Sequence, residues 1–269
     1  MAANAERLSH YSPEKIPTFG INNLKKIDGM ERLNVVLAKT NFALPLVHLN
    51  IPEVNVDAAI GWFNPDPNIN PQIDEASTII MGDMLQALDA KVVVMTNSSK
   101  SEHLIQMAMQ NLPPETRLII LPSGKEEAEG AVIQSRSAGE LTSYTPVTGT
   151  PKVMGYPKEA MSLDELRKLC PNGKGLVIVD DVYTTGETVR TMEKVLGLGE
   201  TNEHHVAVIA IEKQYDGDTG KYIDNTLPSN LHAAFCLTEF LKLDALGINR
   251  DELFPNDKKT IPKAILLPD

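Results

Sequence analysis

The amino-acid sequence predicts an α/β fold in which helices flank a parallel central sheet. The first observation is that, from Ala90 onward, short apolar runs of strand length alternate with segments of helical periodicity, as in successive βαβ units. The second is that the apolar run at residues 176–179 leads directly into a polar segment that opens a helix. Open α/β sheets place their ligands at such carboxyl ends of strands.

The elements follow in order along the chain. Strands are expected at residues 91–96, 117–121, 176–179 and 206–211, and helices at residues 102–112, 163–170 and 188–196. Ser162 and Glu165 form a capping box in front of the second helix, which fixes its start. His204 and His205 are expected in a surface turn before the fourth strand.

Three regions are expected. Residues 1–57 form an N-terminal extension, residues 58–241 the core, and residues 242–269 a polar tail. Within the core, the stretch between Gly124 and Tyr156 is rich in Gly, Ser, Thr and Pro. A loop of this length in a compact domain is more often functional than a filler.

Composition narrows the function classes. The formal charge is −11 and the pI about 5.1, which argues against nucleic acid as a partner because phosphate backbones are bound through clustered Lys and Arg. No apolar run has the length that a membrane helix needs, so we expect a cytoplasmic protein without membrane contact. Cys170 and Cys236 lack zinc-site spacing and are expected to be free core thiols.

The segment from Gly175 to Thr188, GLVIVDDVYTTGET, carries the chemistry. Asp180 and Asp181 follow four apolar residues and should emerge at the end of a central strand. Two acids beside a phosphate site would repel the phosphate, so they must serve another purpose. They can accept hydrogen bonds from sugar hydroxyls, helped by Mg²⁺ between the carboxylates, ribose and diphosphate. For two acids alone, a simple strand-end turn would be the commoner interpretation.

The residues after the acids suit a phosphate group. Backbone amides, three Thr hydroxyls and the positive end of a helix can form a cradle for one phosphate. Gly186 lets the backbone approach the ligand without a Cβ in the way. The cradle consists of Thr184, Thr185, Gly186, Glu187 and Thr188.

This pattern resembles the motif with which type I phosphoribosyltransferases bind 5-phosphoribosyl-1-diphosphate (PRPP), and the resemblance extends across most of residues 67–241. It implies a parallel sheet, a flexible loop over the reaction centre, a small base-binding hood and a homodimer. By the same resemblance, Asp180 and Asp181 contact ribose and Mg-bound PRPP, and Thr184–Thr188 contact the 5-phosphate.

A second match lies upstream. Ser98, Ser99 and Lys100 stand between the first strand and the first helix, where the family places its diphosphate-binding loop. Lys100 would pair with the leaving diphosphate, and Lys125 is what remains of an Arg-Lys pair that the xanthine type carries after its second strand. A solvated loop is the alternative for such a Ser/Lys turn taken alone.

The xanthine and adenine branch of the family is the most similar. Asn70, in Asn-Pro-Gln-Ile-Asp, resembles a base-contacting Asn of the xanthine type, and Lys213, in Ile-Glu-Lys, resembles a Lys that binds purine carbonyls. Lys213 would favour a 6-oxopurine. The alternatives are a turn or cap role for Asn70 and a solvated charge for Lys213. Thr184 departs from hypoxanthine-guanine enzymes, which carry an Asp there.

The reaction implied is attack of a purine nitrogen on the anomeric carbon of PRPP, with inversion and loss of diphosphate. Closure of residues 126–156 would exclude water, and Arg136 and Tyr144 are the loop side chains most able to reach the diphosphate or ribose. Solvated positions are the alternative for both. Two other functions stay open: a PRPP sensor without turnover, and a phosphoribosyltransferase for a pyrimidine, including orotate.

Overall fold

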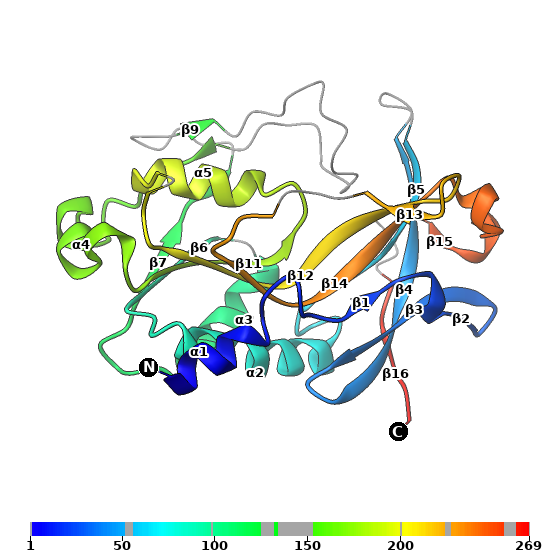
Figure 1. The fold of residues 1–269 in the computed structure, drawn as a ribbon, viewed down its shortest axis with the longest axis horizontal. Coiled ribbons are helices and arrows are strands. Elements are labelled where there is room, and N and C mark those ends of the chain that lie inside the picture. Colours follow the sequence, from blue (N-terminus) through cyan, green and yellow to red (C-terminus); the bar gives the residue numbers. More distant parts are fainter. Residues whose placement is uncertain are drawn as a thin grey trace.

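One mixed sheet runs through the protein in the strand order β2-β3-β4-β5-β14-β12-β11-β6-β7 (Figure 1). The computed structural model describes residues 2–51, 56–97, 99–124, 132–133, 153–199, 201–223, 227–255 and 262–268. The strands of this path are β2 (Leu24–Ile27), β3 (Met30–Leu37), β4 (Thr40–Ile51), β5 (Val56–Gly61), β6 (Val92–Thr96), β7 (Arg117–Leu121), β11 (Leu176–Tyr183), β12 (His205–Asp216) and β14 (Leu231–Leu241).

Five of these strands form the parallel core, which confirms the predicted fold class. β7, β6, β11, β12 and β14 are neighbours in that order and all pair in parallel. Numbered along the chain, the order is 2-1-3-4-5, one of the two common doubly wound arrangements. The connections leave β6 and β11 in opposite directions, so the switch point at which such sheets bind ligands lies between these two strands.

The N-terminal region extends the same sheet. β2, β3, β4 and β5 pair antiparallel in sequence order, and β5 pairs antiparallel with β14. Asp28 and Gly29 turn the chain between β2 and β3 with φ of 54° and 79°, as a two-residue hairpin turn requires. The boundary expected at residue 57 falls inside β5, so backbone pairing joins extension and core directly.

Helices cover the two faces of the sheet separately (Figure 1). Their bounds are α1 (Ala2–Ser9), α2 (Pro71–Ala87), α3 (Ser99–Met109), α4 (Leu163–Leu169) and α5 (Glu187–Leu196). Apolar residues of α2 and α3 join one core cluster, with α1 packed beside them, and those of α4 and α5 join the cluster on the opposite face. The predicted capping box is present at α4, where Ser162 Oγ accepts the Glu165 N–H.

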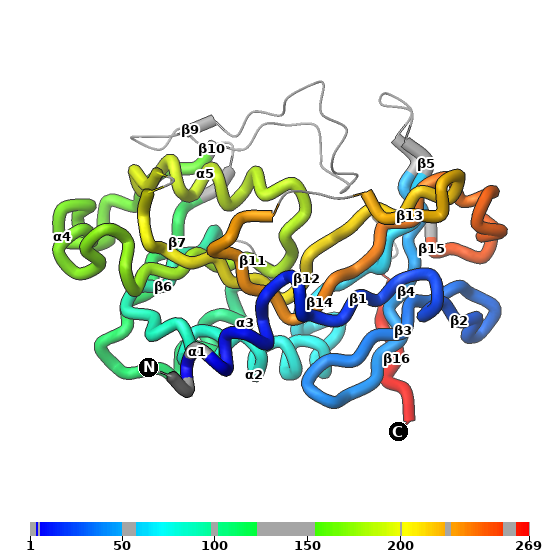
Figure 2. Tube along the Cα trace, in the orientation of Figure 1, coloured from blue at the N-terminus to red at the C-terminus, as the bar shows by residue number. Residues whose placement is uncertain are grey.

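The C-terminal region differs from the expected polar tail. β14 continues to Leu241, and two short 3₁₀ helices, Leu243–Leu246 and Arg250–Glu252, follow it. The chain then returns to β4, with which β15 (Phe254–Pro255) pairs in parallel and β16 (Ile265–Leu266) pairs antiparallel. Figure 2 shows this red segment crossing beside the blue N-terminal strands. Long-range pairing in the sheet, which local polarity does not report, explains the difference.

The N-terminal helix is tied to the core by polar contacts. Arg7 forms an ion pair with Asp83 of α2, and Tyr11 Oη donates to Asp83 Oδ2 over 2.6 Å. Farther along the chain, β1 (Thr18–Phe19) pairs in parallel with β14 over Cys236 and Leu237. β13 (Lys221–Tyr222) pairs antiparallel with the last two residues of β12.

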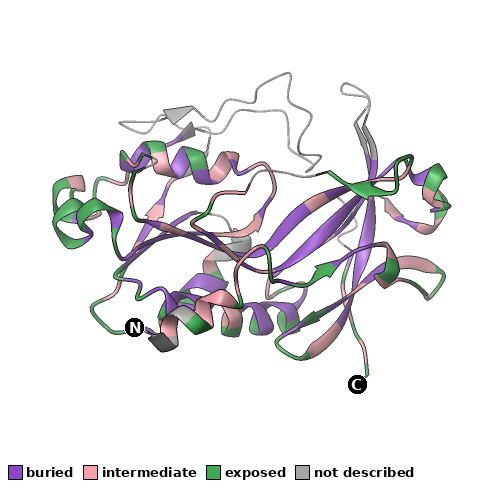
Figure 3. Ribbon diagram, viewed as in Figure 1, coloured by how far each residue is buried: buried purple, intermediate pink, exposed green. Residues whose placement is uncertain are grey.

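Burial follows the strands rather than the turns (Figure 3). Cys170 and Cys236 are buried and free, as expected. The surface turn expected at His204 and His205 is wrong. His204 is only 5% exposed and its Nε2 lies 2.8 Å from Glu193 of α5, while His205 contacts His232. No helix in the described ranges is both long and apolar enough to span a bilayer.

Candidate functional site

The two acids lie on β11 where its pairing with β6 has stopped. β11 pairs with β6 only over Leu176 to Ile178, whereas its pairing with β12 continues to Tyr183. Asp180 and Asp181 are both half-buried and belong to the strand itself, which is four residues longer than expected. Both residues therefore lie on the stretch of β11 whose edge toward β6 is unpaired, at the switch point.

Local hydrogen bonds hold the acid pair. Asp180 Oδ1 accepts the Asp181 N–H over 3.0 Å, and Asp181 Oδ1 accepts the Val182 N–H over 3.0 Å. These bonds orient each carboxylate relative to its own backbone. Half-exposed carboxylates of fixed orientation are suitable acceptors for hydroxyl groups and ligands for hard cations.

The predicted phosphate cradle connects β11 to α5. Thr184 and Thr185 are half-buried, Gly186 is buried and left-handed with φ of 73°, and Glu187 begins the helix. The Glu187 N–H points to Thr185 Oγ1 at 3.4 Å, a long and therefore weak bond. The N-terminus of α5 thus lies at the end of β11, as a helix that binds an anion requires.

Tyr183 is a part of this loop that the sequence interpretation did not single out. A Cβ added to Gly186 would lie 2.5 Å from Tyr183 Cζ, so the ring packs directly against this glycine. Tyr183 is 5% exposed, and burial raises the pKa of its hydroxyl. The structure thus gives a second reason for glycine here, besides access of the backbone to a ligand: a left-handed φ beside an aromatic ring.

Glu187 lies close to where an anion would bind, and its carboxylate forms an ion pair with Arg190. Arg190 Nη2 lies 3.0 Å from Glu187 Oε2, one turn along α5. The Glu187 carboxylate is 29% exposed and the Arg190 side chain 50% exposed. The ion pair reduces the repulsion that a bare carboxylate would exert on a phosphate at the same helix end.

The diphosphate-loop candidates are only partly described. Ser99 and Lys100 are the first residues of α3, so this helix begins three residues earlier than expected, directly after β6. Both therefore lie at the switch point, opposite the end of β11. Ser98, Lys125, Arg136 and Tyr144 lie outside the described residues, as does most of the long loop. Of that loop, the structure describes β8 (Ser123–Gly124), β9 (Val132–Ile133) and β10 (Val153–Met154), which pair with one another.

Asn70 precedes α2 and is 4% exposed. Its Nδ2 donates to the Asn64 carbonyl over 2.9 Å, and its Oδ1 accepts the Ala264 N–H over 3.0 Å. It makes no side-chain cap for α2. The amide therefore links the chain ahead of α2 to the C-terminal region, and a base contact would use its remaining hydrogen-bonding capacity.

Lys213 lies in β12 beyond the last residue that pairs with β11. It is half-buried, and its charge acts on Cys236 of β14, lowering a thiol pKa that burial raises more strongly. The neighbouring Glu212 belongs to the opposite face of the strand. Because α2 covers that opposite face, Asn70 and Lys213 approach the sheet from different sides.

A buried pair of acids stands beside Lys213. Burial, followed by the charge and hydrogen bond of Glu239, raises the pKa of Glu212 well above its ordinary value, and Asp181 contributes a further repulsion. Gln214 Nε2 donates to Glu239 Oε2 over 3.2 Å. Two buried carboxyls in contact are stable only if one carries a proton. Sequence reasoning missed this pair, because the two glutamates lie on separate strands and neither belongs to a motif.

A metal ion would have few protein ligands here. Across the described ranges, no group of three or more His, Cys, Asp or Glu side chains could hold a metal ion. Mg²⁺, however, commonly binds through one or two carboxylates while substrate phosphates and water complete its shell. Asp180 and Asp181, half-exposed at the edge of β11, fit that kind of shared coordination.

Comparisons with known proteins return structures only. No protein-family model matches the chain, and no curated protein matches it. Among solved structures, a purine phosphoribosyltransferase from Pyrococcus horikoshii is similar at 14% identity and a TM-score of 0.35, covering 64% of this chain and 89% of the other.

Two further structures are similar to a comparable degree. The adenine phosphoribosyltransferase of Thermoanaerobacter pseudethanolicus shows 9% identity and a TM-score of 0.38, over 62% of this chain and 81% of the other. A hypoxanthine phosphoribosyltransferase of Staphylococcus aureus shows 10% identity and a TM-score of 0.35, over 61% and 73%.

Proposed function

We propose that this protein is a phosphoribosyltransferase that joins a purine base to PRPP, yielding a nucleoside 5'-monophosphate and diphosphate. One observation carries the proposal: the segment DDVYTTGET occupies the switch point of a doubly wound sheet, with its acids on the part of β11 beyond its pairing with β6 and its glycine at the start of α5. This is where such a fold binds a phosphorylated ligand.

Each part of the segment has a role in binding PRPP. The N–H groups at the start of α5 and the hydroxyls of Thr184, Thr185 and Thr188 hold the 5-phosphate. Asp180 and Asp181 accept hydrogen bonds from the ribose hydroxyls. The start of α3, with Ser99 and Lys100, holds the diphosphate from the other side of the switch point.

A magnesium ion fits this arrangement. Such an ion would supply positive charge that stabilises the leaving diphosphate. Asp180 and Asp181 are the residues that would hold it.

The transfer requires positioning rather than a covalent nucleophile. A purine nitrogen bonds to the anomeric carbon as the bond to diphosphate breaks, and the configuration inverts. Positive charge develops on the ribose while the diphosphate leaves with its electron pair. Asp180 and Asp181 on one side of the switch point and the start of α3 on the other hold the two separating charges at fixed places. Groups that are positioned in advance in this way lower the barrier of such a reaction.

A 6-oxopurine such as xanthine is the base we favour. Lys213 is half-buried on β12 beyond the end of β11, from where its ammonium would donate to a carbonyl oxygen. Asn70, at the start of α2, is the second candidate. Its bonds to Asn64 and Ala264 weaken this candidacy relative to that of Lys213. A homodimer, a cytoplasmic location and a closing role for residues 126–156, with Arg136 and Lys125 near the diphosphate, belong to the same proposal.

The test measures release of diphosphate and nucleotide from PRPP and Mg²⁺ with xanthine, hypoxanthine, guanine, adenine, uracil and orotate as separate acceptors. We expect turnover with one purine. The double variant Asp180→Asn/Asp181→Asn should lower kcat/KM by about 100-fold or more, as loss of groups that stabilise developing charge does.

The matched control is Asp164→Asn, which makes the same chemical change at an acid whose side chain is 83% exposed on α4 and should leave kcat/KM unchanged. PRPP binding is measured in parallel by calorimetry. Binding without product from any acceptor would sink the catalytic proposal and identify a PRPP sensor. Turnover with uracil or orotate alone would transfer the activity to pyrimidines.

A further inference from the structure

Two parallel helices bring their N-termini to the switch point. Four residues separate the end of α2 from the start of β6, and two separate the end of β6 from the start of α3. Both helices therefore run opposite to β6 on the same face of the sheet, and both start at its carboxyl edge. The start of α3 carries Ser99 and Lys100, and the start of α2 follows Asn70. A contact between the first turn of α2 and the N-terminal half of α3 thus acts on the diphosphate side of the site.

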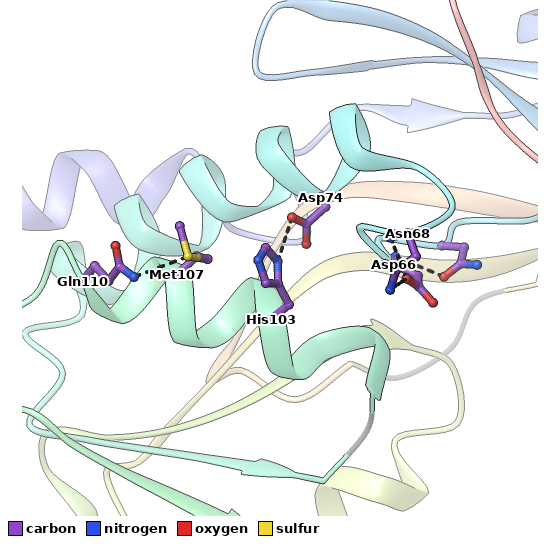
Figure 4. Close-up of polar contacts among 7 residues, drawn as sticks. Asp66, Asn68, Asp74, His103, Met107 and Gln110 are labelled. Atoms are coloured by element: carbon purple, nitrogen blue, oxygen red, sulfur yellow. Dashed lines mark hydrogen bonds and ion pairs between the residues drawn. The ribbon is translucent and has the colours of Figure 1, made fainter.

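Asp74 and His103 form that contact. Figure 4 shows them pointing toward each other from α2 and α3. His103 Nδ1 lies 2.9 Å from Asp74 Oδ2, and the aspartate side chain is 7% exposed whereas the histidine side chain is 46% exposed. Among the described residues, no other ion pair or side-chain hydrogen bond links the N-terminal halves of these two helices.

Asp74 is an unusual residue for a contact that serves stability alone. Its Oδ1 is buried and accepts no hydrogen bond among the described residues, which costs free energy. Burial raises the pKa of Asp74, and the hydrogen bond and charge of His103 oppose that rise. The positive end of α2 also favours a negative charge in its first turn. The histidine is therefore the side chain that compensates this carboxylate.

His103 is placed to affect the start of its helix. Side chains of a helix lean toward its N-terminus, so residue 103 covers the turn that begins at Ser99. With Nδ1 directed at Asp74, the ring is held across the two helices, and rotation or translation of α3 relative to α2 would break the contact. A fixed helix end matters for anion binding because N–H groups lose strength steeply when misaligned.

We propose that Asp74 and His103 are positioning residues that hold the diphosphate-binding end of α3 in place, an inference that rests on the phosphoribosyltransferase function proposed above. The pair touches no substrate. It acts through the backbone of α3, so its loss weakens the binding of diphosphate and PRPP more than it lowers kcat.

The test compares four variants of the full chain: His103→Ala, His103→Asn, Asp74→Ala and the double variant His103→Ala/Asp74→Ala. The amide nitrogen of Asn occupies the place of His Nδ1, so His103→Asn retains a donor to Asp74. Gln106→Ala is the matched control, because Gln106 is exposed on the same helix and bonds only to Glu102 among the described residues. Calorimetry gives Kd for inorganic diphosphate with Mg²⁺ and for PRPP, and kinetics give KM and kcat.

We expect His103→Ala to raise Kd for diphosphate and KM for PRPP about 5- to 10-fold, a change of roughly 1 to 1.4 kcal/mol, with kcat within about twofold of the wild-type value. His103→Asn should recover most of the affinity. The double variant should raise Kd and KM no more than Asp74→Ala does, because the effects of two residues that act as one pair are not additive.

Unchanged affinity in folded His103→Ala and Asp74→Ala would overturn the inference while leaving the proposed function intact. Equal losses in His103→Asn and His103→Ala would also overturn it. Should His103→Ala fail to fold, His103→Asn and Asp74→Ala decide by the same criteria. If the wild-type protein binds neither diphosphate nor PRPP, the proposed function fails, and this inference fails with it.

Discussion

Two structural requirements favour glycine at residue 186, and the stability that each one costs can be measured separately. Its φ of 73° is left-handed, and an added Cβ would collide with the ring of Tyr183. Gly29 has a similar φ of 79° but nothing within 4 Å of an added Cβ. We expect Gly29→Ala to lower the free energy of unfolding by about 1 kcal/mol, the cost of the left-handed conformation. Gly186→Ala should lower the free energy of unfolding by about 3 kcal/mol, because overpacking against Tyr183 adds to the cost of the left-handed conformation.

Urea unfolding of both variants checks this prediction, and calorimetry with PRPP tests its functional side. Gly186→Ala should also weaken PRPP binding, since the Tyr183 ring and the start of α5 must separate to admit a methyl group. Gly29→Ala serves as the control, because the β2–β3 turn is remote from β11 in the sheet order. Equal losses of stability in the two variants would mean that the contact with Tyr183 yields without cost.

β12 and β14 begin with a histidine pair that should make the folded protein sensitive to acid. His232 Nε2 and His205 Nδ1 lie 3.2 Å apart. Burial, then the other histidine, lowers the pKa of His232 to about 4, while burial and His204 lower that of His205. The unfolded chain therefore binds more protons than the folded one between pH ~6.5 and ~4. The stability that this pair contributes is present above that window and is lost as pH falls through it.

His232→Leu should remove much of this dependence. Wild-type protein is expected to lose on the order of 2 kcal/mol of unfolding free energy from this pair between pH ~6.5 and ~4, after allowance for partial exposure, and the variant should lose distinctly less. Urea unfolding across pH 4–7 measures the slope. His10→Gln, at an exposed residue of the N-terminal region, is the control. Parallel slopes for wild type and His232→Leu would contradict the assignment.

At the scale of the whole molecule, the core crosses the boundary between the N-terminal strands and the parallel sheet. One cluster contains Leu33 and Phe42 of the antiparallel strands together with Val93, Val177 and Phe235 of the parallel ones. Because the sheet is also continuous, we expect the protein to unfold in one cooperative transition. If the N-terminal strands folded independently of the parallel sheet, the two parts would instead unfold in separate transitions.

Trp62 makes this testable, since it is the one tryptophan of the chain and packs beside Val47 and Ile60 of β4 and β5. Its fluorescence reports the antiparallel strands, far-UV circular dichroism reports all elements, and thiol labelling of Cys170 reports the opposite core cluster. The three urea midpoints should coincide. A Trp62 midpoint clearly below the other two would show that the antiparallel strands unfold on their own.

Local pattern was enough for four of the five strands of the parallel core, whereas β14 was not predicted. The strand at 117–121 and the helix start at Leu163 agree with the structure, because an apolar run with turn residues and a capping box are local signals. Strand lengths were underestimated where polar residues continue the strand: Asp180 in β11 and Lys213 in β12 are paired by neighbours that only the sheet supplies. The C-terminal strands were missed for the same reason.

For the candidate site, local sequence was enough to single out the segment DDVYTTGET and to predict a phosphorylated sugar as its ligand, because adjacent acids, hydroxyls and a glycine have few other joint uses. Tertiary structure decided what surrounds it. The switch point between β6 and β11, the Tyr183 ring against Gly186, the Glu212–Glu239 pair and the Asp74–His103 contact all join residues through folding. Burial and distance between remote residues create these features, and neither is encoded in local order.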